Sequence, residues 1–371
     1  MRKVIIIGGG LAGLIAAICL RRHKIDVLLI EKKVYPFQRV CGEYISNEVR
    51  NFLEHLDIYP HRHVPSQINR LQLSSVNGKS AFLALQLGGF GISRFTFDHF
   101  LYEKAVETGV DFMLNTQVAD VKFSQDLFTV ATDSGETLQS TVVIGAFGKR
   151  SKLDKSLNRP FFKRKSPYLG VKYHVEYGSH AHDLIALHNF NNGYCGINKI
   201  EDGKYNLCYL SARSNLNNNR KISEMEQNVL CRNPELEKIF SSAKFLFDKP
   251  EVINEISFET KKPVEQHILM CGDAAGMITP LCGNGMAMGI HSAKILCEEI
   301  VPYLNSHNSR FLLEQNYVRR WNTLFKNRLW SGRQIQRLFG SELVSNFAVE
   351  VARRSKPISN FLVRQTHGKP F

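Results

Sequence analysis

Residues 1–31, MRKVIIIGGGLAGLIAAICLRRHKIDVLLIE, decide the fold. Residues 4–7 are a β-branched apolar run, which is typical of a strand buried on both faces. Residues 8–13 then fit the pattern G-x-G-x-x-G. Residues 14–22 predict a helix, and residues 26–30 predict a second strand that ends in Glu31. Strand, glycine turn, helix, strand and acid in this order predict a dinucleotide-binding unit.

Each residue of this unit has a physical task. Gly8 makes the tight turn, Gly10 lets a pyrophosphate approach the backbone, and Gly13 lets helix and strand pack closely. The N–H groups at the helix start, around Leu11 and Ala12, are free to hold phosphates. Glu31 lies eighteen residues after Gly13, where an acid can accept both hydroxyls of an adenosine ribose.

Residues 4–20 also admit two other interpretations, a signal peptide or a membrane span. The run is shorter than the roughly 20 apolar residues that a span needs, and glycines interrupt it. Arg21 and Arg22 follow without a clear cleavage site, and the second strand comes next. We reject both interpretations and expect a cytoplasmic protein, with a peripheral membrane location as the alternative.

Composition and charge narrow the class further. The chain has 371 residues, enough for two interleaved domains, and its eight cysteines include no C-x-x-C pair, which favours small core cysteines in a reducing compartment. The net charge is +14, and residues 301–371 carry +9 of it. This basic segment predicts either a solvated face or an anionic partner: an acidic carrier protein or a membrane surface, with nucleic acid the least favoured.

The order of expected elements predicts an α/β fold, α+β overall. A Rossmann-like domain would comprise residues 1–66, 96–155 and 263–304. An antiparallel-sheet substrate domain would be interleaved with it, and a basic helical segment would follow. The substrate domain would comprise residues 67–95 and 156–262, and the C-terminal segment residues 305–371. Asn77-Gly78 predicts a hairpin, and residues 222–241 predict one helix. Apolar residues at helical spacing between 321 and 339 favour a helix packed on the body over a membrane-binding one.

Three glycine-bearing segments occur in a fixed order: the opening unit, residues 145–151 and residues 272–285. Together they resemble the FAD-dependent oxidoreductases of the p-hydroxybenzoate hydroxylase superfamily, over about 300 residues. Cys41-Gly42-Glu43 after Arg39, and Arg94 before Phe97-Asp98, look most like the geranylgeranyl-reductase branch.

The resemblance implies a set of cofactor contacts. Asp273 would hold the ribityl chain of FAD, and the helix start at residues 283–286 would stabilise negative charge on the reduced flavin. Arg94 would contact the cofactor. The implied FAD-binding residues are Gly8, Gly10, Leu11, Ala12, Gly13, Glu31, Lys32, Arg39, Arg94, Val118, Gly148, Gly272, Asp273, Pro280, Gly283, Asn284, Gly285 and Met286.

Two departures from the family pattern limit which of the family's properties are expected of this chain. Phe147 stands where the second glycine motif usually has an Asp that is linked to flavin and nicotinamide binding, so NADH or NADPH is expected only as a transient donor, if it is the donor at all. The segment around Tyr194 lacks the Trp, Phe and Pro of the reductase branch's substrate motif. Tyr194 remains a candidate substrate contact, but an isoprenoid substrate does not carry over.

Cys41 and Glu43 are the candidate catalytic residues. In the reductase branch the cysteine that matches Cys41 lies near the flavin ring, where a thiol would shape the pocket or relay a proton; the alternative is a buried structural cysteine. Glu43 would donate a proton or cap the helix that follows it. The pairs His61/His63 and His180/His182 lack an evident third ligand, so no metal site is expected.

These residues predict an FAD-dependent oxidoreductase. The favoured reaction is that of a monooxygenase, which hydroxylates a small hydrophobic aromatic or polyene substrate with reduced flavin and O2. The alternatives are a reductase of carbon–carbon double bonds, a carrier- or membrane-docking flavoprotein that uses the basic segment, and a flavoprotein without net redox chemistry such as a cyclase. The sequence does not indicate an oligomeric state.

Overall fold

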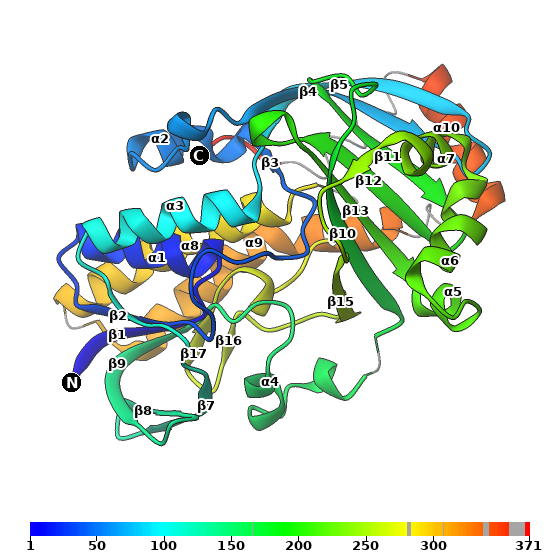
Figure 1. The fold of residues 1–371 in the computed structure, drawn as a ribbon. Coiled ribbons are helices and arrows are strands. Elements are labelled where there is room, and N and C mark those ends of the chain that lie inside the picture. Colours follow the sequence, from blue (N-terminus) through cyan, green and yellow to red (C-terminus); the bar gives the residue numbers. More distant parts are fainter. Residues whose placement is uncertain (165, 280–282, 307, 337–340, 356–367) are drawn as a thin grey trace.

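The computed structural model describes residues 1–371 except residues 165, 280–282, 307, 337–340 and 356–367. Its architecture is two β-sheets joined by loops, with a bundle of long helices beside the first sheet and shorter helices on the second (Figure 1). The mixed α/β fold with a parallel nucleotide-type sheet and a second, mainly antiparallel sheet confirms the predicted class.

The first sheet has the strand order β16-β17-β9-β1-β2-β6, with β7 and β8 attached to β9 through β8. Its strands are β1 (Arg2–Ile7), β2 (Val27–Ile30), β6 (Asp111–Met113), β7 (Val118–Ser124), β8 (Leu127–Thr132), β9 (Thr137–Gly145), β16 (Val264–Glu265) and β17 (Ile268–Met270). Strand β1 pairs in parallel with β2 and β9, and β17 pairs in parallel with β9. Parallel pairing brings the carboxyl ends of β1, β9 and β17, each followed by a glycine motif, to one edge.

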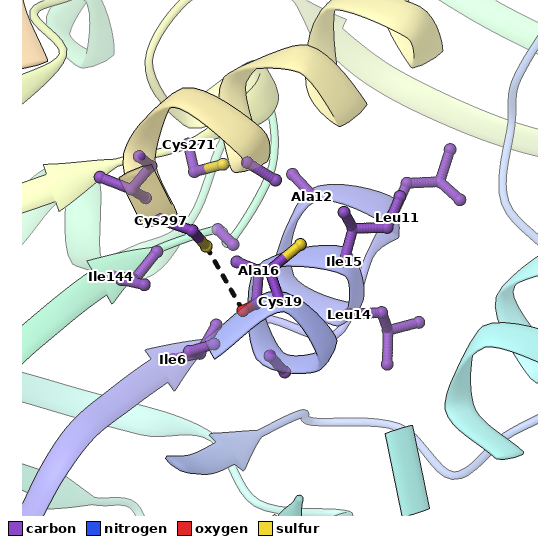
Figure 2. Packing of buried hydrophobic residues seen from close by; sticks show 14 of the residues in the cluster. Ile6, Leu11, Ala12, Leu14, Ile15, Ala16, Cys19, Ile144, Cys271 and Cys297 are labelled. Atoms are coloured by element: carbon purple, nitrogen blue, oxygen red, sulfur yellow. Dashed lines mark hydrogen bonds between the residues drawn. The ribbon is translucent and has the colours of Figure 1, made fainter. Parts of the chain in front are cut away.

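Helices cover this sheet because their apolar faces need burial. Helix α1 (Leu11–Arg22) packs against α3 (Arg94–Glu107) and α8 (Gly285–Ser306), and α8 packs against α9 (Arg310–Gln336). Figure 2 shows the contact of α1 with α8, where the Cys297 thiol donates to Ala16 O. Cys19, Cys271 and Cys297 are all buried there, which confirms them as small core residues.

The second sheet has the order β14-β10-β13-β12-β11-β4-β5-β3, with β15 paired to β10. Its strands are β3 (Tyr44–Ser46), β4 (Ser66–Ser74), β5 (Ser80–Gly91), β10 (Tyr168–Glu176), β11 (Leu184–Phe190), β12 (Gly193–Lys199), β13 (Tyr205–Ala212), β14 (Lys244–Phe245) and β15 (Glu251–Ile256). The hairpin expected at Asn77-Gly78 joins β4 to β5. Strand β3 belongs to this sheet although it lies within residues 1–66, so the sheet takes one strand from the segment predicted for the nucleotide domain.

One face of the second sheet is covered by the helices α5 (Arg213–Asn217), α6 (Ile222–Asn228) and α7 (Pro234–Ser242). The single helix predicted for residues 222–241 is therefore wrong. Pro234 has no N–H to continue a helix, and Asn233 caps a new one by accepting from Glu235 N at 2.9 Å. The opposite face bears Lys172, His174, Asn198 and Asn206, which contact the loop before β3.

The remaining helices are α2 (Arg50–His55), α4 (Lys152–Ser156) and α10 (Glu342–Arg354). Helix α9 confirms the prediction of a helix packed on the body. Its inward face buries Leu313, Tyr317, Trp321 and Phe325 in the main core. The predicted apolar positions Leu338 and Phe339 lie outside the described residues.

Candidate functional site

The glycine turn after β1 has the geometry that its sequence predicts. Gly8 has φ +106°, a conformation that side chains other than glycine rarely adopt. A Cβ added to Gly13 would lie 2.0 Å from Gly8 O, so only glycine lets α1 pack on this turn. A Cβ added to Gly10 would meet nothing nearer than the Arg94 guanidinium at 3.6 Å and that of Arg39 at 3.9 Å. The turn therefore has open space in front of Gly10, with two cations beside it.

Glu31 ends β2 beside this turn and is buried. Its carboxylate accepts from Gly9 N at 2.8 Å and from Lys33 N at 3.1 Å, so its position is fixed by backbone groups. Thr116 N donates to Glu31 O at 3.1 Å, which places the segment before the buried Val118 next to the acid. The side chain of Lys32 is exposed.

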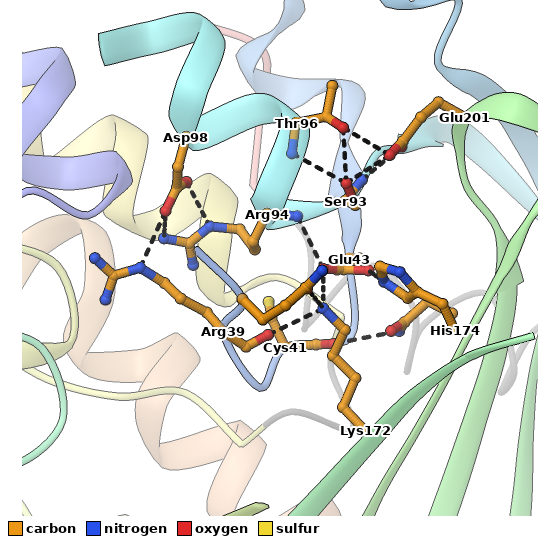
Figure 3. Close-up of polar contacts among 12 residues, drawn as sticks. Arg39, Cys41, Glu43, Ser93, Arg94, Thr96, Asp98, Lys172, His174 and Glu201 are labelled. Atoms are coloured by element: carbon orange, nitrogen blue, oxygen red, sulfur yellow. Dashed lines mark hydrogen bonds and ion pairs between the residues drawn. The ribbon is translucent and has the colours of Figure 1, made fainter. Parts of the chain in front are cut away.

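Asp98 holds the two arginines at the turn (Figure 3). It accepts from Arg94 Nε and Nη2, both at 2.7 Å, and from Arg39 Nε at 3.0 Å. Asp98 is 2% exposed, so this is a charge-assisted network shielded from water. Burial opposes the charge of Arg94, but Asp98 and the Cys41 sulfur outweigh it and the pKa of Arg94 is raised. Asp98 was not among the cofactor-binding residues predicted from the sequence.

The loop of residues 38–43 lies between this turn and the second sheet. Cys41 is half-buried on it, and its electrostatic interaction with Arg94 contributes to raising the pKa of Arg94. Asn206 Nδ2 on β13 donates to Cys41 O at 3.2 Å. The loop that carries Cys41 is therefore held by the second sheet through Cys41 O and by Asp98 through Arg39.

Glu43 is fully buried and has three partners. Its Oε1 accepts from Lys172 Nζ at 2.6 Å and from Arg94 N at 2.8 Å, and its Oε2 lies 2.7 Å from His174 Nε2. Burial alone would raise the pKa of Glu43, but Lys172 and His174 outweigh it and lower this pKa below its ordinary value. Glu43 is thus an ionised group at neutral pH, which makes it a poor proton donor.

Glu43 does cap a helix, but not the one expected. The helix whose first N–H it binds is α3, whereas Ser46 caps the short turn that follows Glu43. A second buried carboxylate, Glu201, accepts from Ser93 N at 2.7 Å at the same helix start. Two anions at this N-terminus complement the helix dipole and join α3 to the second sheet.

The two later glycine motifs meet through a buried lysine. Lys261 Nζ donates to Lys149 O at 2.7 Å and to Asp273 O at 2.8 Å, and lies 4.4 Å from the centre of the Phe161 ring. Gly148 and Gly272 both have positive φ, +81° and +60°. Burial lowers the pKa of Lys261 to about 8. This lysine, which the sequence analysis did not select, therefore ties together the segments that carry Gly148 and Asp273.

The position of the missing Asp in the second motif is taken by an aromatic ring. A Cβ added to Gly145 would lie 2.9 Å from Phe147 Cε1, so the ring folds back over Gly145 and packs on the core. Phe147 offers no acceptor that could replace a carboxylate.

The predicted helix start of the last motif is present. Gly283 has φ +60°, α8 begins at Gly285, and Met286 is buried. Asn284 is fully buried, and its Nδ2 donates to Glu48 Oε2 at 3.3 Å. Pro280 lies outside the described residues.

Tyr194 lies on β12 and is buried in a cluster formed by the second sheet and the loop after β17. The buried members are Leu187, Tyr194, Leu210, Ile256 and Met277, and partly buried Leu71, Leu73, Tyr168, Ile253 and Phe258 pack against them. This face of the sheet is therefore apolar here and polar where Lys172 and His174 meet the loop. The described residues contain no group of His, Cys, Asp and Glu that could hold a metal ion.

Comparison with known proteins agrees with this geometry. A model of the FAD binding domain family matches residues 1–323. The digeranylgeranylglycerophospholipid reductase of Methanosarcina acetivorans is 25% identical over 343 residues, which cover 86% of this chain and 80% of that protein. The FAD-dependent monooxygenase andE of Emericella variicolor is 25% identical over 337 residues, with 82% and 71% covered.

Two solved structures have the same fold. The flavin-dependent brominase Bmp2 superposes with a TM-score of 0.80 at 18% identity and covers 98% of this chain and 93% of its own. A geranylgeranyl bacteriochlorophyll reductase-like protein from Thermoplasma acidophilum gives 0.79 at 16% identity, with 100% and 96% covered.

The residues present fit FAD. Gly10 leaves room for a pyrophosphate beside two guanidinium groups, and it caps α1 without a side chain, so the N–H groups of the first turn remain free to bind it. The acid at the end of β2 is held by backbone N–H groups in the position that a ribose requires. The chain belongs to the FAD binding domain family and is an FAD-dependent oxidoreductase.

Proposed function

We propose that this protein is a monooxygenase that hydroxylates a hydrophobic aromatic or polyene substrate. When bound, FAD supplies the redox chemistry, taking electrons from a donor and passing them to O2. The chain holds the cofactor through the glycine turn, Glu31, Arg39, Arg94 and the helix start at Gly285. The substrate would lie on the apolar face that contains Tyr194.

The state of Glu43 is the observation that carries this proposal. Reduction of a carbon–carbon double bond needs a proton as well as a hydride, and Glu43 was the carboxyl group predicted to supply it. Glu43 is instead ionised and fixed by Lys172 and His174. A hydroxylation does not require a carboxylic acid at this position, which favours the monooxygenase.

One observation favours the reductase as a second candidate. The relatives of this chain include digeranylgeranylglycerophospholipid reductases, and Cys41, the thiol that the sequence matched to that branch, lies half-buried on the loop beside the dinucleotide turn. An isotope experiment separates the two. Enzyme is supplied with a panel of isoprenoid, polyene and aromatic compounds under 18O2, and products are analysed by mass spectrometry.

The monooxygenase predicts one 18O atom in the product and no product without O2. The reductase predicts a product two mass units heavier than the substrate, formed anaerobically by chemically reduced enzyme. Anaerobic product would overturn our first proposal. Phe147 leaves the electron donor open, so NADH and NADPH are added in turn while the flavin absorbance is followed.

The basic C-terminal segment supports a proposal about partners. Several of its arginines are committed to the body: Arg310 to Asp126, Arg320 to Glu298 and Glu299, and Arg328 to Glu48. The exposed apolar side chain of Trp330 nevertheless lies on the same helix, α9, and Leu343 and Phe347 are exposed on α10. We propose that they meet an acidic carrier protein or a membrane surface. No described helix combines the length and apolarity needed to cross a bilayer.

Deleting the basic C-terminal segment, residues 305–371, would not test this partner proposal, because the deletion would also remove α9, which is part of the core. The variant Leu343→Ser/Phe347→Ser keeps α9 intact. It should lose co-sedimentation with vesicles that contain phosphatidylglycerol, or binding to an acidic carrier protein, while it retains FAD. Binding of both partners equal to that of the unmodified protein would contradict the proposal.

A further inference from the structure

Three adjacent strands of the second sheet hold the loop of residues 38–43 by its backbone. Lys172 Nζ on β10 donates to Arg39 O at 3.2 Å, Asn206 Nδ2 on β13 to Cys41 O at 3.2 Å, and Asn198 Nδ2 on β12 to Glu43 O at 3.4 Å. Alternate carbonyl groups of the loop thus each receive a donor from a different strand.

Lys172 makes more contacts to this loop than its neighbours on the sheet. Besides Arg39 O, its ammonium donates to Gln38 Oε1 at 2.9 Å and to Glu43 Oε1 at 2.6 Å. The side chain is 0% exposed. An ammonium group has three N–H donors, so all of them are used on one loop and none remains for water or substrate.

The same loop reaches the dinucleotide turn on its other side. Arg39 Nη2 lies 3.4 Å from Gly9 O, and Asp98 accepts from both Arg39 and Arg94. Figure 3 shows this continuous chain of contacts from Lys172 through the loop to Asp98. A displacement of the loop at Lys172 would therefore move both Cys41 and Arg39, which lie on it.

We propose that Lys172 is a positioning residue for the flavin site: it holds the loop of residues 38–43 so that Cys41 and Arg39 face the cofactor. The lysine acts through the loop and does not touch the reacting atoms. The inference rests on the FAD site of the family and is independent of whether the reaction is hydroxylation or reduction.

Two variants distinguish a positioning role of Lys172 from a role as the counter-ion of Glu43 alone. Lys172→Met leaves Glu43 buried without its closest cation, which destabilises the fold. The double variant Lys172→Met/Glu43→Gln removes both charges and should recover most of the thermal stability. It still lacks the donor to Arg39 O and Gln38, so the loop stays displaced.

The test reconstitutes each apoprotein with FAD and measures the dissociation constant by flavin fluorescence, the visible flavin spectrum and the thermal midpoint. The matched control is Lys244→Met. It removes an exposed lysine that pairs with Glu176, a residue on β10, the strand that also carries Lys172. Loss of hydrogen bonds from a charged donor should weaken FAD binding about tenfold and shift the flavin spectrum in both Lys172 variants. Lys244→Met should leave all three quantities unchanged.

Two results would overturn the inference. One is a folded Lys172→Met protein that binds FAD with the affinity and spectrum of the unmodified protein. The other is a double variant that regains both affinity and spectrum together with stability, because charge balance alone would then explain the lysine. Failure of the unmodified protein to bind FAD would instead contradict the proposed function.

Discussion

Two buried lysines join separate parts of this molecule, and they do so by different means. Lys172 reaches across from the second sheet and meets a carboxylate, Glu43, at 2.6 Å. Lys261 joins the two later glycine motifs through the carbonyl groups of Lys149 and Asp273. A buried cation with an anionic partner forms a fixed ion pair, whereas one with only carbonyl acceptors nearby is held less firmly in its charged form.

The pKa values reflect this contrast. Lys172 contributes to lowering the pKa of Glu43 despite complete burial, so Glu43 remains ionised at neutral pH. Burial lowers the pKa of Lys261 to about 8, although Asp273 and Asp154 act in the other direction. The first junction should therefore be rigid at neutral pH and the second sensitive to mild alkali.

The largest effect is expected from Glu43→Gln. The glutamine keeps an acceptor for Arg94 N but leaves Lys172 as a buried charge without its anion, and removing one partner of a buried pair costs about 3–5 kcal/mol. We expect a thermal midpoint lower by several degrees. A control, Glu176→Gln, removes the exposed partner of Lys244 and should change little. Equal stability of Glu43→Gln and the unmodified protein would show that the pair is not a fixed junction.

A smaller effect is expected from Lys261→Met. The substitution leaves Lys149 O and Asp273 O without this donor, and loss of a buried hydrogen bond costs about 1–3 kcal/mol. Because Asp273 and Gly148 lie on the segments that Lys261 joins, FAD affinity should fall together with the thermal midpoint. Titration of the apoprotein with FAD measures the first and a melting curve the second. Unchanged affinity would mean that this lysine supports the fold alone.

Acid should weaken the Lys172 junction selectively. The pKa of Glu43 is lower in the folded state than its ordinary value of 4.5, so the unfolded chain binds more protons as the pH falls below about 4.5. The stability that Glu43 provides is present above that pH and is lost below it. Melting curves recorded between pH 6 and pH 3 should show that the difference in thermal midpoint between the unmodified protein and Glu43→Gln becomes smaller as the pH falls. A difference in thermal midpoint that stays constant over this range would contradict a lowered pKa of Glu43 in the folded protein.

Raising the pH above neutral should instead increase the stability of the unmodified protein relative to a variant that lacks Lys261. The folded-state pKa of about 8 lies below the ordinary value of 10.5, so between these values the unfolded chain binds more protons and stability rises with pH. The stability of the unmodified protein relative to Lys261→Met should therefore increase from about pH 8 to pH 10. A difference in thermal midpoint between the two proteins that stays constant across this range would show that the pKa of Lys261 is not lowered in the folded state.

The sequence predicted the first sheet and its glycine motifs because these depend on local patterns. The apolar run of β1, the spacing from Gly8 to Gly13 and the acid at Glu31 are contiguous, and their physics is that of a few neighbouring residues. Most strands of the second sheet were also predicted, but β3 and β14 were not: β3 lies in a segment assigned to the nucleotide domain, and β14 has only two residues. The break at Pro234 was missed although the proline itself signalled it.

The polar junctions could not be predicted because their partners are far apart in sequence. Lys172 and Glu43 are separated by 129 residues, and Lys261 and Lys149 by 112. A weak signal did exist: Lys172 and His174 alternate on one face of an otherwise apolar strand, which places two polar groups inward. Asp98 stands four residues after Arg94, the spacing of a helical ion pair. The first signal does not identify Glu43 as the partner of Lys172, and the second does not identify Arg39 as the other partner of Asp98, because both contacts depend on the tertiary fold.

The smallest effect on stability is expected from Gly10→Ala, which tests whether the glycine turn after β1 binds the cofactor. Its added Cβ would lie 3.6 Å from Arg94 Nη2, an ordinary contact, and Gly10 does not have positive φ, so the fold should tolerate alanine. The methyl group would nevertheless occupy the space in front of the turn that a pyrophosphate needs. We expect a thermal midpoint equal to that of the unmodified apoprotein and a weaker dissociation constant for FAD. A destabilised fold would show that Gly10 also serves packing, and an unchanged affinity would show that the space in front of this turn does not receive the pyrophosphate.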